Sequence, residues 1–150
     1  TYCLSYHTLI KELDAFSQEN PHHSLTLGQH LRKCANHIQV DRKDKHLIMA
    51  GLLHDIGKPF TKTFIDKKGR MSSTAHYYNH HHVGAYDALF YLKSSGFDDE
   101  SILLICGYIQ WHMQPYFIKT EKAKDRFIKL VGNEFYTNLM ALHEADKAAH

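Results

Sequence analysis

The chain has 150 residues, a formal net charge of +2 with neutral histidines, 43% hydrophobic and 23% charged residues, which is the composition of one ordinary globular domain. The nearly neutral charge disfavours a non-specific nucleic-acid binder, which must neutralise many phosphates, but it permits a small phosphorylated substrate. The sequence shows no apolar run near the ~20 residues that cross a bilayer and no signal-peptide pattern, so we expect a cytoplasmic protein with no membrane partner.

Histidine is the unusual residue of this chain. It occurs 14 times, and imidazole is the commonest metal-binding side chain. The three cysteines, Cys3, Cys34 and Cys106, are odd in number and lack CxxC spacing, which predicts reduced thiols that fill the core. Residue 1 is Thr rather than Met, so a chain cut from a longer polypeptide is one option that the sequence leaves open. The composition indicates metal chemistry.

Apolar residues recur at helical spacing in six segments. In chain order these predicted helices cover 24–39, with Ser24 as a candidate N-cap, then 44–57, 80–94, 98–112, about 121–131 and about 134–149. Residues 58–79 break the pattern: they suit an extended stretch near Thr63 and a turn at 66–69, so a short hairpin is an option within this long loop. The sequence predicts an all-α fold of six or seven helices in a single domain, residues 1–150, with its core motifs in about 24–150.

Four predicted helices place a polar residue on their apolar face, namely His30, His54, His112 and Asp146. Burying such a group without a partner costs several kcal/mol, on the order of 2–7. A single inward histidine is readily explained as a core imidazole bonded to a backbone carbonyl. A whole set of inward imidazoles and carboxylates, Asp55 included, is explained more simply by one metal centre. Without thiolates, that centre suits Mn, Fe, Co, Ni, Zn or Mg.

A second metal site is conceivable on the first predicted helix. His30, Cys34 and His37 lie on one helical face at steps of four and three residues, a spacing that a structural zinc ion could use. This set lacks a convincing fourth ligand, and it leaves His54, His112 and Asp146 unexplained. We therefore expect it to be the weaker of the two sites.

The segment HDIGKP, residues 54–59, resembles the HD superfamily of metal-dependent phosphohydrolases, whose fold is a helical bundle. The ordered set His30, His54, Asp55, His80, His112 and Asp146 resembles the six-ligand variant of that family. The segments GKPFTK, Gly69-Arg70, HVGA, HM and EAD look most like the HD domain of bacterial CCA-adding tRNA nucleotidyltransferases. This likeness covers about residues 24–150, and the nucleotidyltransferase portion is absent.

The resemblance implies the roles of the site residues. His30, His54, Asp55 and Asp146 would hold one divalent metal ion, His80 and His112 would hold a second, and Asp55 would bridge the two. A metal-bound hydroxide would then hydrolyse phosphomonoesters or phosphodiesters, on nucleotides, 2',3'-cyclic phosphates or an RNA end. Lys58 and Arg70 are candidate phosphate contacts, although a solvated side chain is an equal alternative for Arg70.

The run His80, His81, His82 leaves one choice of ligand open. The family usually has an acidic residue after its third histidine, and the following Val83–Ala85 favours His80 over His81. His81 stays a candidate substrate contact, while His76, Tyr77 and Tyr78 are expected at the mouth of the pocket and His22 and His23 in a plain loop after Pro21.

Two other functions remain open at this point. One is a non-catalytic, nucleotide-sensing module, against which the complete ligand set argues. The other is a di-iron HD oxygenase that acts on a carbon substrate.

Overall fold

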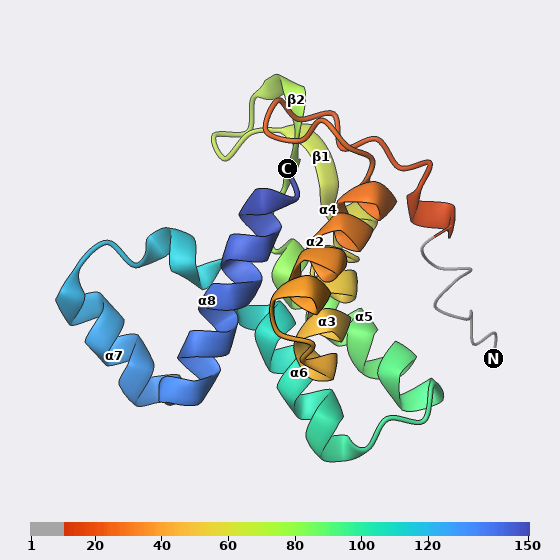
Figure 1. The fold of residues 1–150 in the computed structure, drawn as a ribbon. Helices are drawn as coiled ribbons and strands as arrows, with labels where there is room; N and C mark the ends of the chain where they lie inside the picture. The colour runs from red at the N-terminus through yellow and green to blue at the C-terminus, as the bar shows by residue number, and fades with distance from the viewer. Residues whose placement is uncertain (1–10) are drawn as a thin grey trace.

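The computed structural model describes residues 11–150, and most of them are helical (Figure 1). In chain order the elements are α2 (Leu27–Asp41), α3 (Lys45–Leu53), α4 (Lys58–Thr61), β1 (Lys62–Ile65), β2 (Met71–Tyr77), α5 (His80–Ser94), α6 (Asp99–Trp111), the 3-10 helix η1 (Gln114–Phe117), α7 (Glu121–Val131) and α8 (Asn133–Ala148). The prediction of an all-α fold with six or seven helices is confirmed.

Side-chain caps fix where the helices begin. Thr26, and not Ser24, is the N-cap of α2: its hydroxyl accepts from the backbone of Gln29, whose side chain accepts from the Thr26 backbone in return. This reciprocal pair satisfies two amide groups that a helix start leaves without partners, so the helix begins at Leu27. The side chains of Asp44, Asp98 and Thr120 cap α3, α6 and α7, and each accepts one hydrogen bond from a backbone amide.

The predicted helix over 44–57 ends earlier than expected. Helix α3 stops at Leu53, and residues 54–57 form a turn before the short helix α4. Pro59 lies in the first turn of α4, where its missing amide hydrogen costs nothing. Asp55 therefore lies in a turn between two helices, with its side chain free of the constraints of a helix face.

The short hairpin that the sequence left as an option is present within residues 58–79. Strands β1 and β2 pair antiparallel, with Lys62 opposite Tyr77 and Thr63 opposite His76. Asp66 shapes the turn, because its carboxylate accepts from the backbone amides of Lys68 and Arg70. Gly69 takes a positive φ of 77° there, a conformation that suits glycine.

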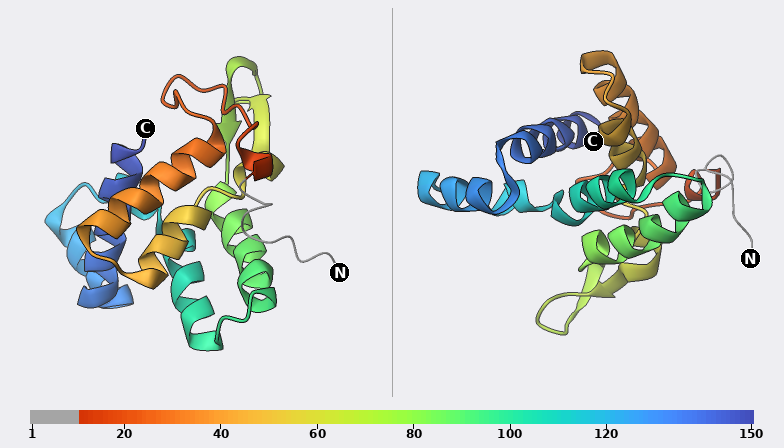
Figure 2. Two further views of the ribbon diagram at one scale, coloured as in Figure 1. Left: turned by 45° about the vertical axis from the view of Figure 1, so that its right-hand side comes forward. Right: turned by 90° about the horizontal axis from the view of Figure 1, so that it is seen from below.

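Helices α2, α3, α6 and α8 pack around the hydrophobic core, and α5 packs along α6 (Figure 2). The largest fully buried side chains of this core include Leu31, Leu47, Ile105 and Leu139. Cys34 is buried and Cys106 half-buried, both as free thiols, while Cys3 lies outside the described residues. Among the described residues, the structure holds no helix long and apolar enough to cross a membrane.

The segment that precedes α2 lies against the hairpin. The Ala75 amide donates to the Glu19 carbonyl at 2.8 Å, and the Asn20 side chain donates to the Ala75 carbonyl at 3.0 Å. The Tyr77 hydroxyl donates to the Gln18 carbonyl. These bonds tie two segments that are far apart in the sequence, and Figure 1 shows them side by side above the ends of α2 and α8.

Candidate metal centre

Five separate segments bring the predicted ligands to one place. His30 comes from α2, His54 and Asp55 from the turn after α3, His80 from the start of α5, His112 from the end of α6 and Asp146 from the last turns of α8. None of the six residues is more than 6% exposed. The fold therefore brings these six side chains together in its interior.

Asp55 lies at the centre of the cluster. Its Oδ2 is 3.4 Å from the Nε2 atoms of both His30 and His54. Its Oδ1 is 3.1 Å from His80 Nε2 and 3.3 Å from His112 Nε2. Each carboxylate oxygen thus faces a different pair of histidines.

Two groups of potential ligands follow from this arrangement, and both contain Asp55. The first half-site consists of His30, His54, Asp55 and Asp146, and the second half-site of Asp55, His80 and His112. Asp146 Oδ1 joins the first half-site at 2.9 Å from His30 Nε2 and 3.2 Å from His54 Nε2. In each half-site the ligand atoms lie within 4.8 Å of one another, which is close enough for one ion.

Backbone carbonyls orient all four histidines. Their Nδ1 atoms contact the carbonyl oxygens of Ala149 (His30, 3.2 Å), Gly51 (His54, 2.8 Å), Tyr77 (His80, 2.8 Å) and Ile109 (His112, 2.6 Å). Because a carbonyl only accepts, each Nδ1 carries a proton, and a neutral ring then presents the lone pair of Nε2 to the cluster. Metal-binding histidines are usually held by such a hydrogen bond from the ring nitrogen that does not bind the metal.

The facing Nε2 atoms fit a cation. Those of His30 and His54 are 3.3 Å apart, and those of His80 and His112 are 3.2 Å apart. Two lone pairs at such a distance repel each other unless a proton or a metal ion lies between them. Four imidazoles and two carboxylates form a nitrogen-rich donor set, which suits transition metals. The residues present therefore fit a divalent metal ion.

Electrostatics keeps the carboxylates ionised. Burial opposes ionisation of Asp55, but the neighbouring Lys58 and His54 hold the pKa of that carboxyl well below its usual range. Burial likewise opposes ionisation of Asp146, and His54 and His150 outweigh it, so the pKa of Asp146 is also well below its usual value. The cluster therefore offers two negative charges to a cation.

Cation binding is expected to release protons and to tighten as the pH rises. Burial alone would lower the pKa of His30, but its contacts with Asp146 and Asp55 outweigh burial and raise that pKa to about 9. Below that pH a cation must displace a proton from His30, and above it the cation meets a neutral ring. Calorimetric titration with Mn²⁺ between about pH 6 and about pH 9, in buffers of different ionisation enthalpy, measures both effects. An affinity that does not change with pH would contradict this protonation state.

Lys58 also contacts the central carboxylate. Its Nζ lies 2.9 Å from Asp55 Oδ2 and 2.7 Å from Gln18 Oε1. The side chain is buried, and the pair with Asp55 is therefore shielded from water. Lys58 is thus placed to fix the orientation of Asp55.

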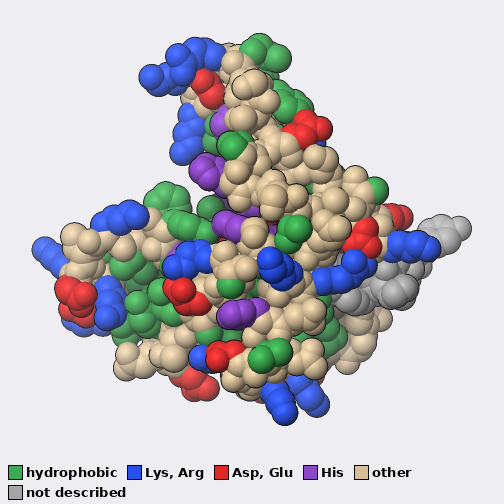
Figure 3. Space-filling view, turned by 45° about the horizontal axis from the view of Figure 1, so that its top comes forward, with side chains coloured by type: hydrophobic (Ala, Val, Ile, Leu, Met, Phe, Trp, Pro, Cys, Tyr) green, Lys and Arg blue, Asp and Glu red, His purple; other side chains and the backbone are tan. Residues whose placement is uncertain are grey.

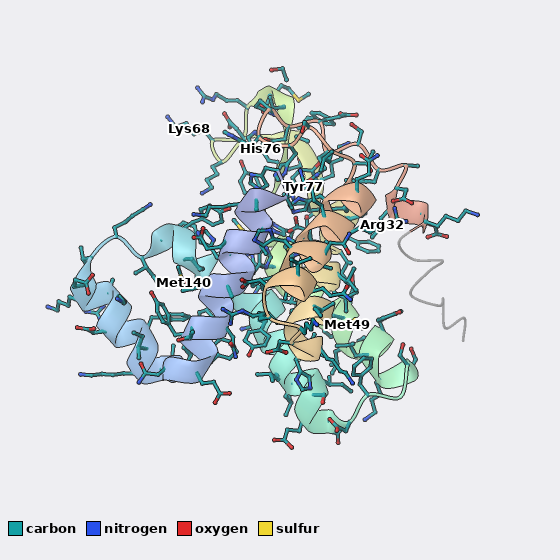
Figure 4. All side chains as sticks on the ribbon, in the orientation of Figure 1. Arg32, Met49, Lys68, His76, Tyr77 and Met140 are labelled. Atoms are coloured by element: carbon teal, nitrogen blue, oxygen red, sulfur yellow. The ribbon has the colours of Figure 1, made fainter. Side chains whose placement is uncertain are left out.

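A cavity of about 490 Å³ opens onto the cluster. Asp55, Lys58, His80, His112 and Asp146 form its floor, so both half-sites are accessible from it. Aromatic rings form part of its walls: His76, Tyr77 and Tyr78 from the hairpin, and Tyr116 from η1. Figure 4 shows His76 and Tyr77 on the hairpin above the end of α8, and Figure 3 shows histidines gathered where the hairpin meets the helices.

Three residues considered from the sequence lie elsewhere. Arg70 is exposed in the hairpin turn, where its guanidinium pairs with Asp66 at 2.9 Å, and it does not line the cavity. His81 does not line the cavity either, and His80 is the residue of this run that contacts Asp55. His37 is exposed on the outer face of α2, so no cluster with His30 and Cys34 forms among the described residues.

His23 lies in the cavity wall, contrary to the expectation of a plain loop. Its ring centroid is 5.6 Å from that of His30 and 4.7 Å from that of His150, which also lines the cavity. Burial and the nearby Lys58 lower the pKa of His23 to about 3, so the ring is neutral near pH 7. The neighbouring Pro21 suggested a solvated loop, and no local pattern reveals that this loop docks on β2.

Comparison with known proteins agrees with this geometry. A family model described as "HD domain" matches residues 22–149. No curated protein matches the chain. HD domains form a superfamily of metal-dependent phosphohydrolases, and the buried His/Asp cluster described above could hold such a metal. Because the match spans most of its length, this chain belongs to the HD domain family.

Proposed function

We propose that this chain hydrolyses phosphomonoesters or phosphodiesters, with nucleotides or 2',3'-cyclic phosphates as substrates, at two divalent metal ions that share Asp55. The arrangement of the histidines around Asp55 supports this proposal. The two oxygens of a single buried carboxylate face two separate pairs of histidines, at the floor of a cavity large enough for a nucleotide. A site for one structural ion needs neither the second pair nor the open cavity.

The bound metal ions would supply a water molecule of lowered pKa and would polarise the phosphoryl oxygens. The first half-site offers more protein ligands than the second, which leaves more room for solvent and substrate near His80 and His112. The four imidazole ligands favour Mn, Fe, Co, Ni or Zn over Mg, which prefers oxygen ligands.

The walls of the cavity support a substrate with a planar ring. The rings of His76 and Tyr78 stack in parallel, with centroids 5.4 Å apart, and both line the cavity. A nucleobase stacked on an aromatic side chain gains about 1–3 kcal/mol. The sequence motifs resemble those of the HD domain of CCA-adding tRNA nucleotidyltransferases, so the end of an RNA is one candidate substrate of this kind.

Lys58 contributes a positive charge at the floor. Its ammonium orients Asp55 and lines the cavity, where it can also contact a phosphoryl oxygen. An anionic substrate such as a phosphate ester is therefore favoured. Because none of the six ligand residues is missing, turnover is also favoured over a module that only senses nucleotides.

A screen of the metal-loaded chain tests this function. We expect phosphate release from 2'-, 3'- or 5'-nucleotides, or ring opening of 2',3'-cyclic nucleotides followed by chromatography, and we expect EDTA to stop either reaction. Tight nucleotide binding without turnover would instead indicate a sensor. Oxygen consumption with iron loaded, and without phosphate chemistry, would indicate an oxygenase.

Replacing Lys58 with Met is expected to lower kcat/KM by about 10²-fold, because it removes a charge-assisted contact at the reacting centre. Steady-state kinetics on the best substrate of the screen measures this. Lys122→Met is the matched control, since Lys122 is exposed on α7 and does not line the cavity. Equal activity of Lys58→Met and Lys122→Met would contradict the role of Lys58.

A further inference from the structure

His23 lies next to Lys58 in the cavity wall and belongs to neither half-site. Its Nε2 is 3.5 Å from Lys58 Nζ. Its Nδ1 is buried and has no hydrogen-bond partner among the described residues. Because Nδ1 is buried, Nε2 is the nitrogen that a ligand in the cavity can reach, in place of its long contact with Lys58.

Backbone and side-chain bonds hold this ring in place. Asn20 is anchored to β2 by the bond from its side chain to the Ala75 carbonyl, and its own carbonyl accepts from the His23 amide at 3.0 Å. The His150 ring packs edge-on against the His23 ring. The segment thus presents His23 at a defined position, although it lies in a loop.

A third metal ion is a poor explanation for His23. His23, His30 and His150 are close enough to share an ion, but both nitrogens of His30 are already used. Its Nδ1 contacts the Ala149 carbonyl, and its Nε2 faces Asp55 and Asp146 in the first half-site. Two histidines would remain, which is fewer than a metal site normally has.

Hydrogen-bond counting at Lys58 points to an anion instead. An ammonium has three donors. Two of them are used by Asp55 and Gln18, and the third points to His23 Nε2, which accepts it only over a long 3.5 Å. When the proton of the neutral His23 ring lies on Nε2 instead of Nδ1, this long bond is lost. Lys58 and His23 then present two adjacent donors, and one shared acceptor oxygen of a ligand satisfies both.

We propose that His23 and Lys58 together bind a phosphoryl oxygen of the substrate, with His23 donating from Nε2. This inference rests on the proposed phosphate-ester substrate. His23 would be a positioning residue for the phosphoryl group and would not ligate the metal ions. Its removal should weaken phosphate binding and leave the metal content unchanged.

Calorimetric binding of inorganic phosphate to the metal-loaded chain tests this assignment without requiring turnover. His23→Ala is expected to weaken phosphate binding by about 10- to 100-fold, the effect of losing one hydrogen bond to a charged group. His23→Gln should retain much of the affinity, because its amide reaches the place of Nε2. His23→Asn should not, because its amide reaches only the place of Nδ1. The control is His37→Ala, a histidine on the outer face of α2, and it should bind phosphate like the unmodified chain.

The outcomes separate this inference from the proposed function. Loss of metal from folded His23→Ala would show that His23 is a metal ligand and would overturn the inference. Unchanged phosphate affinity in His23→Ala, equal affinities of the Gln and Asn variants, or no phosphate binding by the unmodified chain would overturn it too. If the unmodified chain binds phosphate more tightly than His23→Ala but hydrolyses no ester, the phosphate site stands and the proposed hydrolysis fails.

Discussion

Asp55→Ala is expected to abolish metal-dependent turnover, with a loss of at least about 10³-fold in kcat, because metal-ion catalysis contributes several kcal/mol. Asp55 is the one residue that both half-sites share, and each of its oxygens faces two histidines. Alanine removes both contacts at once. It also leaves the buried Lys58 ammonium without its carboxylate partner. We expect the metal content, measured by mass spectrometry, to fall together with the activity.

The control for this substitution is Asp125→Ala, which removes an exposed aspartate on α7, away from the cavity. It should keep both activity and metal content. Asp55→Asn separates charge from shape, since it keeps the volume of the side chain but not its negative charge, and we expect it to be nearly as inactive as Asp55→Ala. Full activity of Asp55→Ala at saturating metal would contradict the bridging role.

Gly57→Ala is expected to destabilise the fold by about 3 kcal/mol or more, at the upper end of the cost of overpacking. A Cβ at position 57 would lie 2.2 Å from the His80 carbonyl oxygen and 2.6 Å from the Gly84 amide nitrogen. Both are backbone atoms of α5, so relief requires α5 to move away from α4. His80 would move with it, and the second half-site would open. Urea unfolding gives the change in stability, and metal analysis gives the change at the site.

Gly107→Ala is the matched control for this effect. Gly107 lies inside α6, where an added Cβ would meet only the Phe135 ring, at 3.3 Å. Alanine also favours a helix over glycine by about 1 kcal/mol, so we expect a change in stability of no more than about that size. If Gly57→Ala proved as stable as Gly107→Ala, the close approach of α4 to α5 would not be essential to the fold.

Local periodicity was sufficient to predict the helices and the inward direction of several polar residues. His30, His112 and Asp146 each follow apolar residues at steps of three, four or seven, and such steps define one face of a helix wherever the helix is placed. The helix starts were less predictable. Ser24 and Thr26 both have cap chemistry, and the reciprocal bond with Gln29 decides between them.

Contacts between distant segments could not be predicted from the sequence. His23 and Gln18 reach the cavity because Asn20 bonds to Ala75, which is 55 residues away, and no local pattern encodes that bond. Arg70 was predicted as a phosphate contact, but it pairs with Asp66, only four residues away, and does not line the cavity. In the sequence, only the following Val83–Ala85 favoured His80 over His81 as the ligand. The contact of His80 with Asp55 comes from the packing of α4 against α5.

Two divalent ions that share Asp55 would be located by anomalous diffraction from crystals of the chain loaded with Mn²⁺. This ion binds scattered histidines weakly in comparison with Ni²⁺ or Cu²⁺. We expect this two-ion site to give two anomalous peaks, one beside each oxygen of Asp55, with His30, His54 and Asp146 around the first and His80 and His112 around the second. A single peak in one half-site, or a peak that Asp55 does not contact, would contradict it.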